Sequence, residues 1–340
     1  MYASAGVRPR VDLAGALSNF TLGGHVAHRV LPMLMSAQVS GQYFTVDNAT
    51  SMRIIKTKRA ARAETVRVDT VIGNGTYICE ERSAEEAVDA TQVARFGNVL
   101  DAEGLALQTA TGYVGNDYEN DVAGAVLNTT TFPVSGTTGL TASNAWSDPT
   151  NATPLADVGV VKGYAENQGV QLNAMVLSQL AARYLWNTDA VQQRLTQNYG
   201  GSTGLIPMEP TEADLARIFM LDEVIIAKSK KNTAIPGATN AFSSIWSDTL
   251  VAVFAKSMDP TLRTPQLGRT FVWTNAFSAL EGSGVANMPL PTEAPPSIYA
   301  LAAAYDYADP KVKSNVVGCQ MFTDEVLLNT TSACKLIQIG

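Results

Sequence analysis

Histidine is scarce in this chain, which has two histidines among its 340 residues. His25 and His28 form an H-x-x-H pair, but a zinc site needs three or four ligands and the sequence offers no third histidine. A Ser-His-Asp or Cys-His site would have to use one of the same two residues. We therefore expect no catalytic, cofactor or metal site built on histidine, and we do not expect an enzyme.

Reactive cysteines and phosphate-binding motifs are also lacking. Cys79, Cys319 and Cys334 are an odd number of cysteines without C-x-x-C spacing, so we interpret them as small buried residues kept reduced. The stretch Gly200–Gly204 lacks the G-K-[ST] ending of a P-loop and does not lie between a strand and a helix, which favours a loop.

Positive charge is in short supply as well. Lys and Arg number 24 against 31 Asp and Glu, which gives a net charge of −7 and a pI of about 5.0. This balance disfavours a sequence-independent nucleic-acid binder, because such proteins need a basic excess to neutralise phosphates. Charged residues make up only 16% of the chain, which suits a protein that buries much of its surface against its own copies.

Long apolar runs are missing too. No run approaches the roughly 20 residues that cross a bilayer, and residues 1–13 lack the apolar core of a signal peptide. We expect neither membrane insertion nor secretion.

A basic segment is the first positive feature. Val66, Val68, Thr70 and Ile72 alternate with polar residues as in a strand, and residues 52–57 are its predicted partner. The two strands would form a long hairpin with a charged tip. Between residues 53 and 67 the chain has six bases and one acid, Glu64, and these bases are Arg53, Lys56, Lys58, Arg59, Arg62 and Arg67.

This basic tip has three interpretations. It could be a solvated loop, or a nucleic-acid patch, although it has no interleaved aromatic residues. The third, which we favour, is an inter-subunit clasp that lies on the acidic surface of a neighbouring copy, because opposite patches on one chain encode head-to-tail contacts. The expected contact residues are Lys56, Lys58, Arg59, Arg62 and Arg67.

An acidic segment follows. Ser83 and Glu86 have the spacing of a capping box, which predicts a long helix over 83–111 that Gly112 and Gly115 end, with a second helical piece over 117–127. The acidic residues could form a metal cluster, but their positions on adjacent turns favour helix capping and an acidic partner surface. They are Glu80, Glu81, Glu85 and Glu86.

The remaining chain predicts an α+β protein. An arm with one short helix is expected over 1–45, a polar linker over 128–150, and a surface loop over 281–297. Helices are predicted over 155–167, 179–186 and 211–219, and strands over 174–177, 223–227, 250–255, 270–274, 315–322 and 333–339.

The order of these segments, with several local motifs, resembles the major capsid proteins of tailed phages of the Hong Kong 97 type. The motifs are Tyr77-Ile78-Cys79-Glu80-Glu81, Asp117-Tyr118-Glu119-Asn120-Asp121-Val122-Ala123, Trp146-Ser147-Asp148, Asn173-Ala174-Met175-Val176-Leu177, Phe242-Ser243-Ser244-Ile245-Trp246 and Gly268-Arg269-Thr270-Phe271-Val272-Trp273. The resemblance implies an N-terminal arm (1–45), an extended loop hairpin (46–80), a spine helix with peripheral domain (81–150), an axial domain (151–300) and C-terminal strands returning to the peripheral domain (301–340).

The resemblance also implies a function. It implies a shell protein of the virion, assembled in the host bacterial cytoplasm into pentamers and hexamers around double-stranded DNA without sequence-specific binding. Expected partners are further copies of the chain, a portal, a maturation protease, sometimes a decoration protein, and a separate scaffold protein. Two alternatives remain open: the shell of a cellular nanocompartment with the same fold, and a soluble α+β enzyme using residues 80–86 or 200–204.

Overall fold

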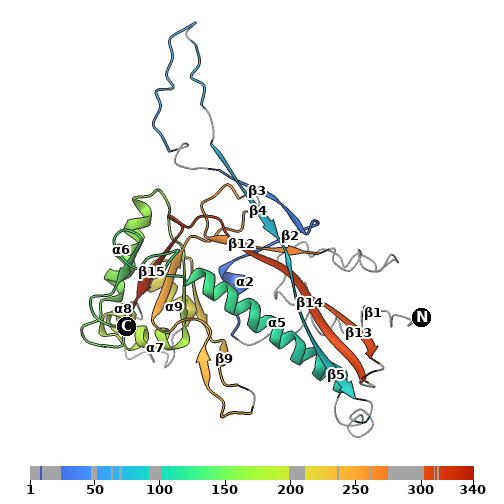
Figure 1. Cartoon of the computed structure of the whole chain (residues 1–340). Coiled ribbons are helices and arrows are strands. Elements are labelled where there is room, and N and C mark those ends of the chain that lie inside the picture. Colours follow the sequence, from blue (N-terminus) through green and yellow to red (C-terminus); the bar gives the residue numbers. More distant parts are fainter. Residues whose placement is uncertain are drawn as a thin grey trace.

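The computed structural model places two β-sheets around one long helix, α5, with two projections that leave the body at opposite edges (Figure 1). The residues that it describes are 8–9, 24–46, 52–62, 64–68, 71–89, 91, 101–198, 211–235, 237–259, 262–274, 302–309, 311 and 314–340. Predicted loops over 200–204 and 281–297 lie outside them. No helix within the described ranges is long and apolar enough to cross a membrane.

We call the part of the chain that is built on a five-stranded mixed sheet the axial domain. In pairing order its strands are β6 (Gly139–Thr141), β15 (Cys334–Gln338), β11 (Leu250–Phe254), β7 (Ala174–Ser178) and β8 (Glu223–Ala227). Helices cover one face, namely α6 (Pro154–Glu166), α7 (Gln179–Asn187), α8 (Asp189–Asn198) and α9 (Glu212–Phe219). Met175 and Leu177 pack against these helices, whereas Ala174 and Val176 enter the core around α5. Because both faces are covered, these strands are almost continuously apolar.

We call the part of the chain that contains the second sheet the peripheral domain. Its strands, in pairing order, are β1 (Arg8–Pro9), β13 (Ala303–Asp309), β14 (Ser314–Leu327), β12 (Gly268–Trp273) and β2 (Met33–Ser36), and β5 (Glu80–Asp89) also pairs with the long strand β14. The predicted strands over 315–322 and 333–339 are confirmed, but only the first joins this sheet. The expectation that both C-terminal strands return to the peripheral domain is therefore wrong, because β15 pairs with β11 in the axial sheet.

The long helix is shifted along the chain from its predicted position. α5 runs from Ala102 to Val126, about 37 Å at 1.5 Å per residue, and Asp101 caps it by accepting a hydrogen bond from the Gly104 amide (3.1 Å). Gly112 and Gly115 do not break it, contrary to the prediction. Each glycine costs about 1 kcal/mol of helix propensity, but packing of α5 on β5, β14 and the axial core outweighs that cost.

The residues from Glu80 to Asp89 form a strand, so the predicted helix start at Ser83 is wrong. β5 pairs with β14 over ten residue pairs, and this long-range ladder overrides the local capping signal. Positions 82, 84, 86 and 88 are more buried than their neighbours. That alternation is hidden in the sequence because two of the inward positions, Arg82 and Glu86, are charged.

The projecting loop begins from a two-stranded ribbon of β3 (Ser40–Val46) and β4 (Ile72–Ile78). The predicted pairing of 52–57 with 66–72 is wrong, since no described residue from 52 to 68 belongs to a strand. One face of the ribbon packs on the peripheral sheet, where Tyr43 and Tyr77 stack on Phe271 with ring centroids 5.7 and 4.3 Å away. Gly41 and Gly75 face these rings, because a Cβ there would lie within 3 Å of a tyrosine oxygen.

The segment from Gly24 to Ser36 belongs to the body, although residues 1–45 were predicted to form an arm. It contains α2 (Ala27–Val30) and β2, and Val26, Ala27 and Leu31 are buried. The carboxylate of Glu119 on α5, itself 1% exposed, accepts hydrogen bonds from the amides of Val26 (3.0 Å) and Ala27 (2.9 Å).

The same carboxylate reaches the axial side of the molecule. It accepts a hydrogen bond from Trp246 Nε1 at 2.6 Å and one from Ser229 Oγ at 3.3 Å. Glu119 therefore connects α5, the N-terminal segment and the axial domain.

We expect Glu119→Ala to lower the free energy of unfolding by about 3–5 kcal/mol, because buried N–H donors lose their acceptor. Urea unfolding followed by circular dichroism measures this. Glu166→Ala, which removes an exposed glutamate of α6, is the control and should cost less than about 0.5 kcal/mol. A Glu119→Ala variant as stable as this control would contradict the role of Glu119.

Candidate functional site

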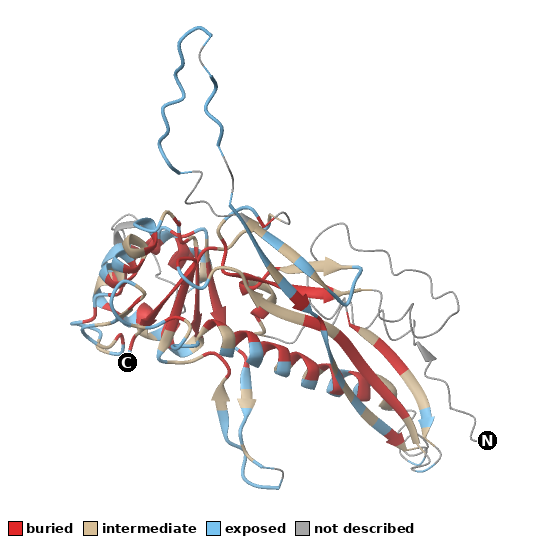
Figure 2. Ribbon diagram, turned by 45° about the horizontal axis from the view of Figure 1, so that its top comes forward, coloured by how far each residue is buried: buried red, intermediate tan, exposed pale blue. Residues whose placement is uncertain are grey.

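The extended loop, residues 52–68, leaves the body as a long exposed excursion (Figure 2), and each of its described residues is exposed. The bases predicted to form the clasp (Lys56, Lys58, Arg59, Arg62 and Arg67) lie on it. Arg62 turns the chain at the tip with φ of +64°, a conformation uncommon for a residue other than glycine.

Apolar side chains on the extended loop are exposed together with the basic ones. Ile54 is fully exposed, and Val66 and Val68 are 46% and 61% exposed. Covering such a side chain stabilises a protein by about 1.5–3 kcal/mol. The loop therefore presents an apolar and basic ribbon that its own subunit leaves uncovered.

An acidic groove of about 900 Å³ lies between β5, α5, β14 and the end of β4, where Thr76 and Ile78 line it. It contains six carboxylates and one guanidinium, a surplus of five negative charges, from Glu80, Glu81, Asp117, Asp121, Asp324, Glu325 and Arg82. Arg82 forms ion pairs with Asp117, with Asp121 (2.7 Å) and with Glu325 (2.9 Å). The exposed ring of Tyr113 lines the same groove.

The carboxylates of the acidic groove lie in different electrostatic environments. Burial raises the pKa of Glu325 above its ordinary value, and the ion pair with Arg82 offsets this only in part. Asp324 is held differently, since its Oδ2 accepts a hydrogen bond from the Ile78 amide at 2.8 Å. One guanidinium does not neutralise this groove, which suits a cationic partner.

The structure divides the four glutamates that were predicted to form one acidic surface. Glu80 and Glu81 line the acidic groove, whereas Glu85 accepts hydrogen bonds from the hydroxyls of Tyr305 (2.6 Å) and Tyr307 (2.8 Å), and Glu86 is half-buried. Sequence reasoning missed the acids that complete the groove, although the i, i+4 spacing of Asp117 and Asp121 places both on one helix face.

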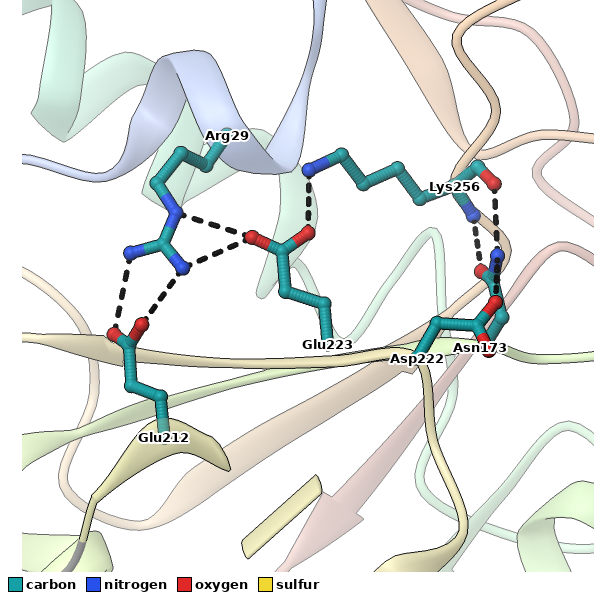
Figure 3. Close-up of polar contacts among 6 residues, drawn as sticks. All are labelled: Arg29, Asn173, Glu212, Asp222, Glu223 and Lys256. Atoms are coloured by element: carbon teal, nitrogen blue, oxygen red, sulfur yellow. Dashed lines mark hydrogen bonds and ion pairs between the residues drawn. The ribbon is translucent and has the colours of Figure 1, made fainter. Parts of the chain in front are cut away.

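A second ionic cluster fixes the N-terminal segment to the axial domain (Figure 3). Arg29 of α2 donates to both oxygens of Glu212 on α9 (3.2 and 2.7 Å), and its Nε and Nη2 donate to Glu223 of β8 (3.1 and 2.9 Å). Lys256 pairs with the other oxygen of Glu223 at 2.5 Å.

Asn173 extends this cluster. Its Oδ1 accepts from the Lys256 amide (2.7 Å), and its Nδ2 donates to the Lys256 carbonyl (3.0 Å) and to Asp222 (3.2 Å). Burial acts to raise the pKa of Glu223, but Lys256 and Arg29 outweigh it and lower that pKa. Glu223 thus stays charged at neutral pH, and the cluster is structural.

His28 lies near this cluster, because the charges of Arg29, Lys256 and Glu223 act on it, whereas His25 lies near Glu119 and Asn116. His25 Nε2 lies 3.0 Å from Asn116 Oδ1, and burial lowers the pKa of both histidines. In the described part of the chain, no group of three or more His, Cys, Asp or Glu side chains is arranged to hold a metal ion. Cys79, Cys319 and Cys334 are buried free thiols, as expected.

No protein-family model matches the chain, and no curated protein matches it. Among solved structures, the chain is similar to a phage-related protein from Bordetella bronchiseptica RB50, with a TM-score of 0.66, 17% identity and 98% of each chain covered. It is also similar to a virus-like particle from Pyrococcus furiosus, with a TM-score of 0.51, 10% identity and 96% of each chain covered.

A third match is a structure from Mycobacterium phage Adephagia, with a TM-score of 0.51, 7% identity, and 94% of this chain and 91% of that chain covered. At these identities the likeness concerns the fold. The chain has the α+β, Hong Kong 97-like capsid fold that its sequence predicted, over nearly its whole length.

A pH dependence follows from His28. Burial, then the charges of Arg29 and Lys256, lower its pKa to about 4, whereas the unfolded chain has a pKa near 6.5. Between these values the unfolded state binds more protons, so stability falls as the pH falls from 6.5 to 4. We expect the free energy of unfolding of the His28→Gln variant to fall by about 2–3 kcal/mol less than that of the wild type over this pH range. Urea unfolding of both proteins across this range tests it, and equal slopes would contradict it.

Proposed function

We propose that this chain is a major capsid protein that self-assembles into the icosahedral shell around the double-stranded DNA genome of a tailed phage. The observation that carries the proposal is the full-length fold match to a phage-related protein and a virus-like particle. Assembly in the bacterial cytoplasm, a portal and a separate scaffold protein belong to the same proposal, and a decoration protein is an optional further partner.

Uncovered surface supports this role. The extended loop exposes basic and apolar side chains far from the body, which is costly for a protein that acts alone. Surfaces of this kind mark interaction sites, and head-to-tail contacts between identical subunits close into rings when the rotation permits.

The clasp is the contact that we assign to the basic tip. Its residues Lys56, Lys58, Arg59, Arg62 and Arg67 would lie on a neighbour's acidic surface, which includes Glu80 and Glu81. The acidic groove supports this assignment by its negative surplus. Glu85 and Glu86 would contribute at most through their long-range field, because Glu85 is occupied by two tyrosines and Glu86 is half-buried.

Net charge supports packaging of DNA without tight binding. A chain with net charge −7 neutralises few phosphates. Its binding to DNA therefore releases few counterions and is weak. The alternative, a nanocompartment shell with the same fold, is favoured by the match to a virus-like particle, and it predicts protein cargo in place of nucleic acid.

Expression of the chain with and without its scaffold, followed by negative-stain electron microscopy and analytical ultracentrifugation, tests the proposal. Closed hollow particles support a shell protein, and their content separates the two shell types. Nucleic acid with a portal vertex indicates a phage capsid, and protein cargo indicates a nanocompartment. A protein that stays monomeric with scaffold present contradicts both.

We expect Arg59→Glu combined with Arg62→Glu to abolish particle assembly at physiological salt and to leave a folded monomer, because the clasp would repel its acidic partner. Sedimentation velocity and circular dichroism measure the two parts. The matched control, Arg183→Glu with Arg194→Glu, makes the same charge change at exposed positions of α7 and α8. Intact particles from the loop variant would rule out the clasp.

A further inference from the structure

A hairpin projects from the edge opposite the extended loop (Figures 1 and 2). Its strands, β9 (Lys230–Asn232) and β10 (Phe242–Ser244), pair over three residues. Asn232 fixes the connecting segment, because its Oδ1 accepts from the amides of Ala234 and Ala241 at 3.0 Å each and its Nδ2 donates to Asn240 Oδ1 at 3.0 Å. Asn232 therefore links both ends of the described connecting segment to the end of β9.

The surface chemistry of this hairpin is unusual for the chain. No charged residue occurs from Asn232 to Ser247, and the side chains of Ile235 and Phe242 are 76% and 71% exposed. Beyond Lys230 and Lys231 at its base, this projection is uncharged and carries two large exposed apolar side chains. This is the chemistry of a contact surface, because buried interface centres are depleted of charge and rich in aromatic residues.

The outer face of the β3–β4 ribbon has the same chemistry at the other edge of the molecule. Phe44, Ile72 and Ile78 lie on this face, since they share the even positions of paired strands, and they are 58%, 64% and 62% exposed. Residues 37–46 and 71–79 contain no charged residue. The opposite face of the ribbon already packs on Phe271, so this apolar face is the one left for a partner.

We propose that the hairpin of one copy docks on the outer face of the β3–β4 ribbon of the next copy, with Phe242 and Ile235 against Phe44, Ile72 and Ile78. The proposal rests on the proposed shell function and names a second contact besides the charged clasp. In a head-to-tail ring, each copy presents one edge to the opposite edge of its neighbour, and these two surfaces lie on opposite edges (Figure 1).

Charge distinguishes the two contacts, which are the basic loop tip on the acidic groove and the hairpin on the ribbon. The basic loop tip would leave unpaired charges on an apolar ribbon, which costs free energy when water is excluded. The end of the hairpin, beyond Lys230 and Lys231, is uncharged, and in the acidic groove it would likewise leave carboxylates desolvated without a cation. The two surfaces adjoin, because Ile78 of the ribbon also lines the acidic groove, and charge therefore assigns each projection to its own part of this surface.

Disulfide trapping tests the contact. The double variants pair Phe242→Cys with Phe44→Cys, Ile72→Cys or Ile78→Cys, and the three native cysteines are buried. We expect at least one pair to give disulfide-linked oligomers on non-reducing gels when assembled particles are oxidised, and none when unassembled monomers are oxidised. The matched control joins Phe44→Cys to Val160→Cys, which is 42% exposed on α6, and should give none.

Truncation provides a second measurement. We expect Ile235→Ser with Phe242→Ser to raise the critical assembly concentration at least tenfold, whereas Leu105→Ser, at an exposed site of α5, leaves it unchanged within about twofold. Normal particles in which no cysteine pair cross-links and the truncation has no effect would overturn the docking contact and leave the shell function intact. A wild-type chain that forms no particles would overturn both.

Discussion

The buried carboxyl group of Glu119 holds the parts of this protein in their arrangement. It lies on α5, which packs in the core between both sheets, and it accepts hydrogen bonds from the N-terminal segment, from Trp246 and from Ser229. A buried polar group is tolerated only when it is hydrogen-bonded. These parts must therefore be in place together, which fixes the axial domain relative to α5.

The N-terminal segment extends this constraint across the molecule. Arg29 holds one end of it to Glu212 and Glu223 of the axial domain, and β2 joins the other end to β12 in the peripheral sheet. The body is thereby tied at three places along one short segment. The extended loop and the hairpin lie outside these contacts, and their apolar side chains are exposed. In the shell that we propose, these exposed side chains are left for contacts with neighbouring copies.

The sequence predicted the central strands of the axial sheet well, but it missed β5 of the peripheral sheet, β6 (139–141) of the axial sheet lies outside the predicted 151–300, and β12 (268–273), predicted inside that range, joins the peripheral sheet. Strands such as 174–177 and 250–255 are covered on both faces, so their apolar runs are visible without knowledge of a partner. In β5 the inward positions include Arg82 and Glu86, whose environment is created by α5 and β14. The local capping signal of Ser83 and Glu86 was then the stronger one, and it predicted a helix where a ladder of ten pairs forms.

Composition and local periodicity were enough to predict the fold class, strands such as β7 and β11, the excess of basic residues in the loop and the scarcity of residues for catalysis. Long-range packing determines which acids gather into the groove, where α5 begins, and that the hairpin and the ribbon lie at opposite edges. Asp117, Asp324 and Glu80 are far apart in sequence, and they become neighbours through long-range strand pairing and helix packing that no local pattern encodes.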